Sequence, residues 1–413
     1  MRIRNPGFWI RNPGYPGSAS LPLLVSFSIM CSLFKVELEA LLGLIYMRGL
    51  LGANLIDVSQ LWSIHFSPVF AATMSQNRFS FLMSHLRLDH KPTRDITRDK
   101  FAAARQILTL FNINCARAMQ CGAWLAFDET LYPNRGNGYG FRMYIGSKPW
   151  KYGILYRSLN DAEVAYTYQV HACAGKPAGE PTEHYVQGAA MTIITCLDAY
   201  VAEGNSVKGC NVTIDRAYSN IHVVQRLGEK YQMTAVGTIC SNRKGLPPHF
   251  KNPVGRKVGD YQVLWDVDSN INIHSEIVKK KSGQAHNVLV ISTMYPILGL
   301  TKDNKKPAIV NLYNVTMGGT DIVDLLMTHK TVRWKSNRWN MSAFAFMLDT
   351  AVVNANTIAG LHDGMTKPDT RDFRYELVAQ LVLPHIRRRL VSRGIQTHIR
   401  TKAQLYMGKY FTK

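Results

Sequence analysis

The sequence lacks the features of disulfide-stapled, zinc-binding and membrane-spanning proteins. Its seven cysteines include no C-x-x-C pair, and none follows Cys240. An odd cysteine count without such pairs is typical of a reducing compartment and argues against a zinc module. No apolar run reaches the roughly 18 residues that a membrane-spanning helix needs. Because 46% of the 413 residues are hydrophobic, the composition predicts a globular protein of about two or three domains.

Acidic residues are also scarce. The chain has 28 aspartates and glutamates against 49 lysines and arginines, which gives a formal net charge of +21 with neutral histidines and a pI of about 9.7. Such an excess predicts a polyanionic partner. Nucleic acid accounts for it better than a membrane surface does, because no basic amphipathic helix stands alone in the sequence. We therefore expect a nucleic-acid partner and no membrane.

The first 34 residues differ from the rest. The sequence Ile-Arg-Asn-Pro-Gly occurs at residues 3–7 and again at 10–14, with nothing periodic around it, which predicts a disordered or atypical leader over 1–34. Residues 21–34 are apolar and follow three arginines, as in a secretory signal. A buried first helix or strand is favoured, because no small-residue cleavage site follows and Lys35 leads directly into a helical pattern.

The remaining chain changes character twice. Apolar residues at helical spacing predict helices over 37–51, 77–88 and 100–119. From Trp124 onward, short β-branched and aromatic runs separated by Gly, Pro and Asn predict strands. The expected strands are 124–128, 141–145, 152–156, 166–172, 211–214 and 233–239, with helices near 187–200 and 221–231. Strands followed by alternating helices and strands indicate a mixed α/β sheet.

The last part of the chain returns to helices. Residues 241–295 are polar and lysine-rich, strand-like at 261–265 and 287–291, and indicate an insertion. Helices are expected from Asp321 to about residue 390. The tail from His385 onward carries no acidic residue. Its cations are Arg387, Arg388, Arg389, Arg393, Arg400, Lys402, Lys409 and Lys413. Such a run is usually a solvated face or a frayed tail, and otherwise a phosphate-binding arm.

Aspartates stand at positions that suit a metal site. Asp128 and Asp215 each end an apolar strand, where ligands bind in open α/β folds. Asp321 follows Gly-Gly-Thr at a helix start, with Asp324 one turn further on the same face. Clustered carboxylates need a cation between them, and oxygen ligands select Mg²⁺, which supports phosphoryl transfer. The alternative is that each aspartate only caps a helix or turn.

Six motifs follow one another along the chain. They are Phe127-Asp128-Glu129, residues 141–154 (FRMYIGSKPWKYGI), 213–219 (TIDRAYS), 236–242 (VGTICSN), 318–324 (GGTDIVD) and 333–339 (RWKSNRW). Their order, their spacing and their amino-acid residues closely resemble those of the piggyBac transposase family. Residues 35–49 (KVELEALLGLIYMRG) and 74–89 (MSQNRFSFLMSHLRLD) are similar as well, so the resemblance extends over about 35–390.

This resemblance implies a ribonuclease H-like catalytic core with an insertion, flanked by a helical dimerisation and DNA-binding domain. The implied divisions are 35–120 (helical), 121–240 (core), 241–310 (β-rich insertion), 311–345 (end of the core) and 346–413 (helical part and basic tail). By motif, Asp128, Asp215 and Asp321 are the catalytic, metal-binding triad, with Asp324 as a fourth, supporting metal ligand. Family members cut DNA at element ends, form a hairpin on the excised end and insert at TTAA.

The resemblance also implies cofactors and partners. Mg²⁺ is the expected ion, with Mn²⁺ as a substitute, and no structural zinc is expected. Double-stranded DNA is the expected partner, with a homodimer in the nucleus. Trp339 matches a family tryptophan that stacks on DNA, although on its own it reads as a core aromatic. The expected DNA contacts are Lys148, Lys151, Arg243, Arg333, Arg338, Trp339, Arg387, Arg388 and Arg389.

Departures from the family pattern keep other functions open. Arg216 stands where the family has Asn, so it could depress the pKa of Asp215 or compete with the metal. Cys240 replaces a frequently basic residue, and a cysteine-rich zinc domain and an acidic N-terminal segment have no counterpart in the sequence. A domesticated or decayed DNA-binding protein without catalysis is the main alternative. A non-transposase nuclease of the same fold is the third.

Overall fold

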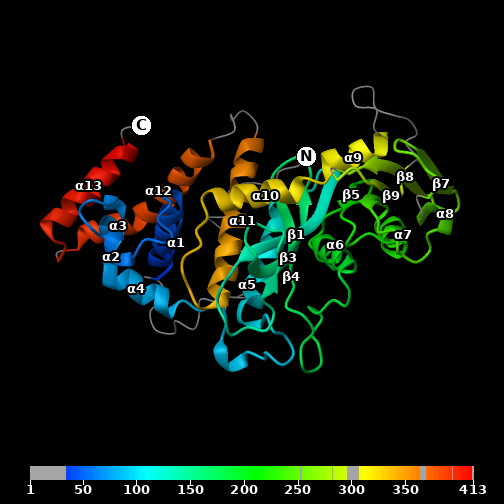
Figure 1. The fold of residues 1–413 in the computed structure, drawn as a ribbon. Helices are drawn as coiled ribbons and strands as arrows, with labels where there is room; N and C mark the ends of the chain where they lie inside the picture. Colours follow the sequence, from blue (N-terminus) through cyan, green and yellow to red (C-terminus); the bar gives the residue numbers. More distant parts are fainter. Residues whose placement is uncertain are drawn as a thin grey trace.

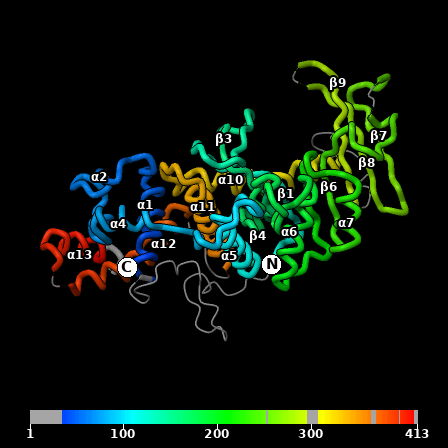
Figure 2. The backbone as a smooth tube through the Cα atoms, turned by 90° about the horizontal axis from the view of Figure 1, so that it is seen from below, coloured from blue at the N-terminus to red at the C-terminus, as the bar shows by residue number. Residues whose placement is uncertain are grey.

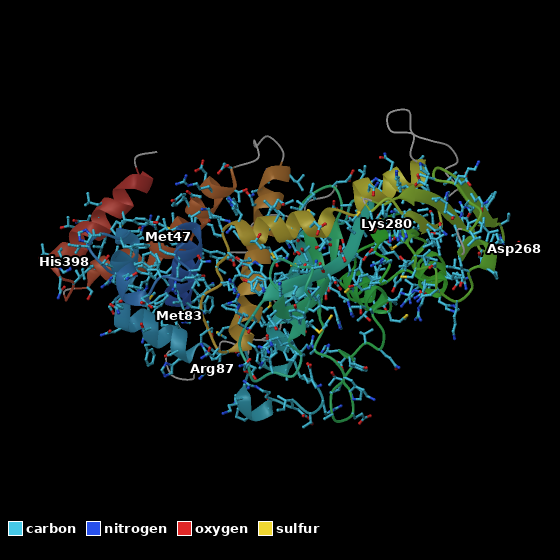
Figure 3. The ribbon with its side chains drawn as sticks, in the orientation of Figure 1. Met47, Met83, Arg87, Asp268, Lys280 and His398 are labelled. Atoms are coloured by element: carbon cyan, nitrogen blue, oxygen red, sulfur yellow. The ribbon has the colours of Figure 1, made fainter. Side chains whose placement is uncertain are left out.

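The computed structural model describes residues 34–251, 254–280, 282–294, 307–362, 369–392 and 394–411. Figure 1 shows an elongated molecule with a helical lobe at one end, a sheet with helices on both faces in the middle, and a β-rich extension at the other end. His398 and Asp268 mark the two extremes (Figure 3). Of the predicted leader, only Phe34 is described, as the first residue of a helix. Arg393 and Lys413 lie outside the described residues.

The helical lobe is built from both ends of the chain. The front contributes α1 (Phe34–Leu50), α2 (Val58–Leu61), α3 (Pro68–Thr73) and α4 (Gln76–His85), and the back contributes α12 (Thr370–Val391) and α13 (Thr397–Phe411). α1 packs along α12, and α13 packs on α3, so the blue and red helices lie side by side in Figure 1. The helices predicted over 37–51 and 77–88 are confirmed. α2 and α3 are too short for apolar periodicity to reveal them.

The central sheet is mixed, as predicted. Its strands are β1 (Trp124–Pro133), β2 (Met143–Tyr144), β3 (Tyr152–Asp161), β4 (Thr167–Ala172), β5 (Asn211–Ile214) and β6 (Thr234–Thr238). β3 pairs antiparallel with β1, β2 and β4, whereas β1, β5 and β6 are parallel neighbours. The crossovers between parallel strands run through α6 (Thr192–Ala202) and α7 (Ile221–Tyr231). This order of strands and crossovers is that of a ribonuclease H-like sheet.

The β-rich segment extends this same sheet. After α8 (Pro248–Lys251) come β7 (Tyr261–Asp266), β8 (Ile271–Lys279) and β9 (Ala285–Ser292), and β9 pairs antiparallel with β6. Figure 2 shows the three strands projecting from the sheet. The sequence pattern did not predict β8. Its buried positions include polar residues such as Asn272 and His274, which hydrogen-bond to each other at 2.7 Å, so the strand does not read as apolar.

Four longer helices pack around the sheet. They are α5 (Ala102–Ala118), α9 (Ala308–Thr316), α10 (Gly319–His329) and α11 (Trp339–Leu361), and a short turn of helix, η2 (Lys91–Thr93), precedes α5. The helical stretch expected over 321–390 is thus broken, and α9 precedes it. α11 is long and apolar enough by composition to cross a membrane, but most of its residues are buried inside the protein, as in a core helix.

Side chains along β1 alternate between two cores. Leu125 and Phe127 pack in the cluster formed with α6 and α7. On the other face, Thr130 bonds to α10 and Tyr132 bonds to α11. β1 therefore connects the two layers, and α10 lies directly against it.

Gly319 allows this close approach of α10. A Cβ atom at this position would lie 2.4 Å from the carbonyl oxygen of Asp161, whereas a Cβ at the neighbouring Gly318 would meet nothing within 4 Å. We expect Gly319→Ala to lower the free energy of unfolding by about 1–3 kcal/mol through overpacking. Gly318→Ala is the matched control and should change it little. Denaturant unfolding of both variants tests this, and equal stabilities would contradict it.

Candidate active site

Asp128 lies inside β1 rather than at its end. β3 pairs with the strand as far as Pro133, so β1 continues past the apolar run that the sequence pattern marked. The Asp128 carboxylate accepts a hydrogen bond from the backbone N–H of Glu129 at 2.7 Å. Burial chiefly, and then the neighbouring Asp215, raise the pKa of Asp128 to about 6. Two of the predicted carboxylates are therefore close enough to repel each other.

Asp215 follows β5, the parallel neighbour of β1. Its Oδ1 accepts hydrogen bonds from the Thr238 hydroxyl at 3.3 Å and from the Tyr313 hydroxyl at 3.5 Å. These donors come from β6 and α9. Both donors are neutral hydroxyl groups, and they orient the carboxylate.

α10 supplies the third carboxylate, and Asp324 is the one that faces β1. Its Oδ1 accepts a hydrogen bond from the Thr130 hydroxyl at 2.7 Å. Burial chiefly, and then the Asp321 and Asp128 carboxylates, raise the pKa of Asp324 to about 7. Asp321 itself is exposed, one turn earlier on the helix. Asp128 is thus coupled electrostatically to both Asp215 and Asp324.

The donor chemistry of this cluster suits a hard divalent cation, because all its charged ligands are carboxylate oxygens. The raised pKa values of Asp128 and Asp324 show carboxylates that are crowded and partly desolvated. Within the described residues, however, no three acidic, histidine or cysteine side chains stand close enough to hold one ion. A divalent cation therefore suits the chemistry of four carboxylates, those of Asp128, Asp215, Asp321 and Asp324. Within the described residues, however, these carboxylates are not arranged around one common binding position.

Lys148 is a predicted DNA contact whose charge acts on these carboxylates. Its Nζ donates to the carbonyl oxygen of Glu129 at 3.2 Å, and its charge lowers the pKa of both Asp128 and Asp324. On the other face of β1, the Glu129 side chain accepts a hydrogen bond from the Tyr218 hydroxyl at 2.9 Å. The site therefore has an ammonium group beside its carboxylates.

Lys151 and Arg333 lie together in a basic groove that includes the end of β1. A cavity of about 600 Å³ is lined by Pro133, Arg135, Arg142, Pro149, Trp150, Lys151, Tyr152 and Arg333. The Arg333 guanidinium lies 5.0 Å from the centre of the Trp150 ring, and Arg142 lies 5.2 Å from that of Tyr152. Cations beside partly exposed aromatic rings are typical of surfaces that bind single-stranded nucleic acid.

Three other predicted DNA contacts are engaged inside the protein. Arg338 donates to the carbonyl oxygens of Met83, Ser84 and Leu86 at the end of α4. Arg389 donates in the same way to the end of α3, and Arg243 donates to the loop that follows Asp215. Arg387 is exposed on α12, and Arg388 contacts His385 at 3.1 Å. The guanidinium groups of Arg338, Arg389 and Arg243 thus have structural roles as well.

Trp339 and the two positions that depart from the family pattern, Arg216 and Cys240, all keep some exposure to solvent. Trp339 is half-buried at the start of α11, with ring centres 5.1 Å from Phe101 and 5.0 Å from Phe141. Arg216 is exposed beside Asp215, and Cys240 is half-buried just after β6. The Trp339 ring therefore packs in an aromatic cluster, and part of its surface stays accessible.

The site also contains groups that the sequence pattern did not single out. Thr130, Thr238 and Tyr313 donate to the carboxylates, and each comes from a different element. No local spacing signals them, because the strand pairing and the packing of α9 bring them together. Thr130 was the most accessible to prediction, since it shares the face of Asp128 in β1.

The sheet order and the carboxylates in β1, directly after β5 and in α10 define a ribonuclease H-like protein. The sequence model of the transposase IS4 family matches residues 28–356. The chain therefore belongs to the transposase IS4 family, and within it to the piggyBac transposases and the proteins derived from them.

The relatives come from both sequence and structure. The human (Homo sapiens) piggyBac transposable element-derived protein 3 is 22% identical over 373 residues, 87% of this chain and 61% of that protein. The human chimeric ERCC6-PGBD3 protein is 22% identical over the same length, 34% of that protein. The cryo-EM structure of a piggyBac transposase synaptic complex with hairpin DNA matches with a TM-score of 0.79 and 28% identity, over 89% of this chain and 75% of that one. The chain spans about three fifths and one third of the two human proteins.

Proposed function

We propose that this chain is a piggyBac-like DNA transposase or a transposase-derived protein that cleaves DNA and transfers strands at TTAA sites. The observation that carries the proposal is the electrostatic coupling of Asp128, Asp215 and Asp324, from three elements, beside Lys148 in this fold. A similar fold occurs in a protein whose structure contains hairpin DNA. The basic groove of Lys151 and Arg333 also includes Pro133, the last residue of the strand β1 that carries Asp128.

The chain's own residues have distinct roles in this proposal. Asp128, Asp215, Asp321 and Asp324 would hold Mg²⁺, or Mn²⁺ in its place, and the ion would supply the Lewis acid for phosphoryl transfer. Thr130, Thr238 and Tyr313 orient the carboxylates by donating to them. The Lys148 ammonium lies where it can neutralise a phosphate oxygen beside the carboxylates.

An assay with hairpin and plasmid DNA tests this function without knowledge of the element ends. The full chain is incubated with a TTAA-tipped hairpin oligonucleotide, a TTAA-containing plasmid and Mg²⁺. We expect hairpin opening or joining by the wild type and neither reaction by Asp215→Asn. Equal activity in the two proteins would contradict the catalytic assignment. A companion plasmid without TTAA tests the target sequence.

The alternative is a domesticated or decayed protein that binds DNA without cutting it. It is favoured by the exposed Asp321 and by the absence, within the described residues, of an assembled group of three metal-binding side chains. Salt-dependent binding by a folded protein that shows neither reaction with Mg²⁺ or Mn²⁺ supports this alternative.

We further propose that the protein acts as a homodimer in the nucleus. Light scattering tests the dimer, and microscopy of a tagged chain tests the location.

The basic groove gives a quantitative prediction about DNA binding. If Lys151 contacts a phosphate, Lys151→Met should weaken duplex binding and reduce the slope of log K against log salt by about 0.9. Lys208→Met removes the same charge from an exposed position outside the groove and should leave the slope unchanged. Fluorescence anisotropy at several salt concentrations measures both slopes. Identical slopes in the two variants would exclude Lys151 from the interface.

A further inference from the structure

A second basic cavity, of about 220 Å³, opens on the face of the sheet that turns away from Asp128. Arg157, which lines it, stands opposite Glu129 in the register of β1 and β3. Because successive side chains of a strand point to opposite faces, Glu129 and Arg157 share the face opposite Asp128. The Arg157 Nη1 donates to the Thr192 hydroxyl of α6 at 3.0 Å, which places the cavity on the α6 side.

The cavity has a large excess of positive charge. Its cationic lining residues are Arg98, Lys100, Arg105, Arg157 and Lys176, and its one carboxylate is that of Asp99. Asp99 is already paired with Arg105, at 2.7 and 3.1 Å. Within the described residues, the ammonium groups of Lys100 and Lys176 make no ion pair. The positive charges of the cavity lining therefore outnumber its single carboxylate.

Two polar groups in the lining are buried without a hydrogen-bond partner within the described residues. They are Nε of Arg157 and the hydroxyl of Thr182. Buried polar groups are nearly always bonded in folded proteins, so each such group calls for a partner. One partner that accepts from a guanidinium, a hydroxyl and an ammonium together is an oxyanion with several oxygens.

Two histidines line the cavity, and burial and the nearby arginines lower the pKa of each. Burial first, and then Arg105 and Arg157, lower the pKa of His171 to about 3. The pKa of His184 is lowered by burial and by Arg105. Both rings line the cavity and remain neutral near pH 7, so each can still donate one N–H. The charge of the site thus comes from its lysines and arginines.

We propose that this cavity binds a phosphate group, carried either by the DNA backbone or by a free inorganic polyphosphate. Arg157 and Thr182 meet the bound oxygens from inside, and Lys100 and Lys176 close over them from the loops. The cavity is connected to β1 by a chain of contacts, because the Arg157 guanidinium lies 5.5 Å from the ring centre of Tyr218, and the Tyr218 hydroxyl donates to the Glu129 carboxylate. Only the DNA source of this phosphate rests on the proposed function.

Titration calorimetry of the full chain with pyrophosphate, without added metal, tests the free ligand. We expect Lys176→Met to bind pyrophosphate about tenfold more weakly than wild type, a loss of about 1.4 kcal/mol. Lys100→Met should weaken binding similarly. Lys208→Met has the same net charge as these variants and should bind like wild type. Lys176 is exposed, so its variant should keep the wild-type melting temperature.

The same proteins titrated with a DNA duplex distinguish the two sources. If pyrophosphate does not bind, but Lys176→Met and Lys100→Met lower duplex affinity and Lys208→Met does not, the ligand is the DNA backbone. Pyrophosphate binding that all three variants retain, or no effect with either ligand, overturns the proposal. Strand transfer is measured in parallel, so a chain that binds pyrophosphate at this cavity yet transfers no strand refutes the catalytic function alone.

Discussion

Asp128→Asn and Asp215→Asn are each expected to lower strand transfer by on the order of 10³-fold, because each removes a charge from the carboxylate cluster. Asparagine keeps the shape of the side chain, and the surrounding donors still find one oxygen. Rates of hairpin opening and plasmid joining under single-turnover conditions measure the loss. The loss of activity should not come from a broken ion pair that destabilises the fold, because neither carboxylate forms an ion pair within the described residues.

Stability provides the check on this prediction. Burial and the neighbouring Asp215 raise the pKa of Asp128, so the ionised side chain destabilises the fold. Asp128→Asn should therefore melt no lower than wild type while losing activity. The control is Asp268→Asn, which removes an exposed carboxylate at the far end of the β-rich extension and should leave activity intact. Equal activity losses in Asp128→Asn and Asp268→Asn would refute the assignment.

The sequence predicted the elements of the core better than their connections. The run before Asp128 and the run before Asp215 are strands because β-branched and aromatic residues fill them, and they belong to the mixed sheet that the order of elements predicted. The sequence could not show that β1 continues to Pro133, since that depends on its pairing with β3. The strand β8 was missed because polar residues occupy several of its buried positions, so its sequence does not read as apolar.

Charged residues were harder to assign than strands. Arg338 and Arg389 are predicted DNA contacts, and in the structure both also donate to carbonyl oxygens at helix ends far away in the sequence. A helix end needs donors for its last carbonyl groups, and nothing local reveals which arginine supplies them. Lys148 and Lys151 came from the same reasoning, and the structure places them beside the carboxylates and in a basic groove. All four residues stay predicted DNA contacts, and the sequence alone does not show which of them also bond within the protein.

Asp349→Ala is expected to lower the free energy of unfolding by roughly 3 kcal/mol or more, because it leaves several buried donors without an acceptor. Asp349 is completely buried in α11 and accepts hydrogen bonds from the Tyr132 hydroxyl at 2.8 Å, the Thr331 hydroxyl at 2.6 Å and the Val332 N–H at 2.8 Å. Tyr132 belongs to β1, and the other two donors follow α10. Denaturant unfolding at pH 7 measures the loss.

Asp349→Asn separates the lost acceptor from the lost charge. The asparagine keeps one acceptor oxygen for Val332 and can donate to the two hydroxyls, so its cost at pH 7 should be about 1 kcal/mol.

Burial raises the pKa of Asp349 from its ordinary value of 3.8 to about 6. The folded protein then holds this proton more tightly than the unfolded chain, so the contribution of Asp349 to stability falls by roughly 2 kcal/mol as pH rises from 4 to 7. Asp349→Asn should lack that fall, and an unchanged pH dependence in this variant would show that folding does not raise the pKa of Asp349. Because the same hydrogen bonds connect β1 to the end of α10, Asp349→Ala should also loosen the placement of Asp324 against Thr130 and reduce strand transfer even in the fraction that remains folded.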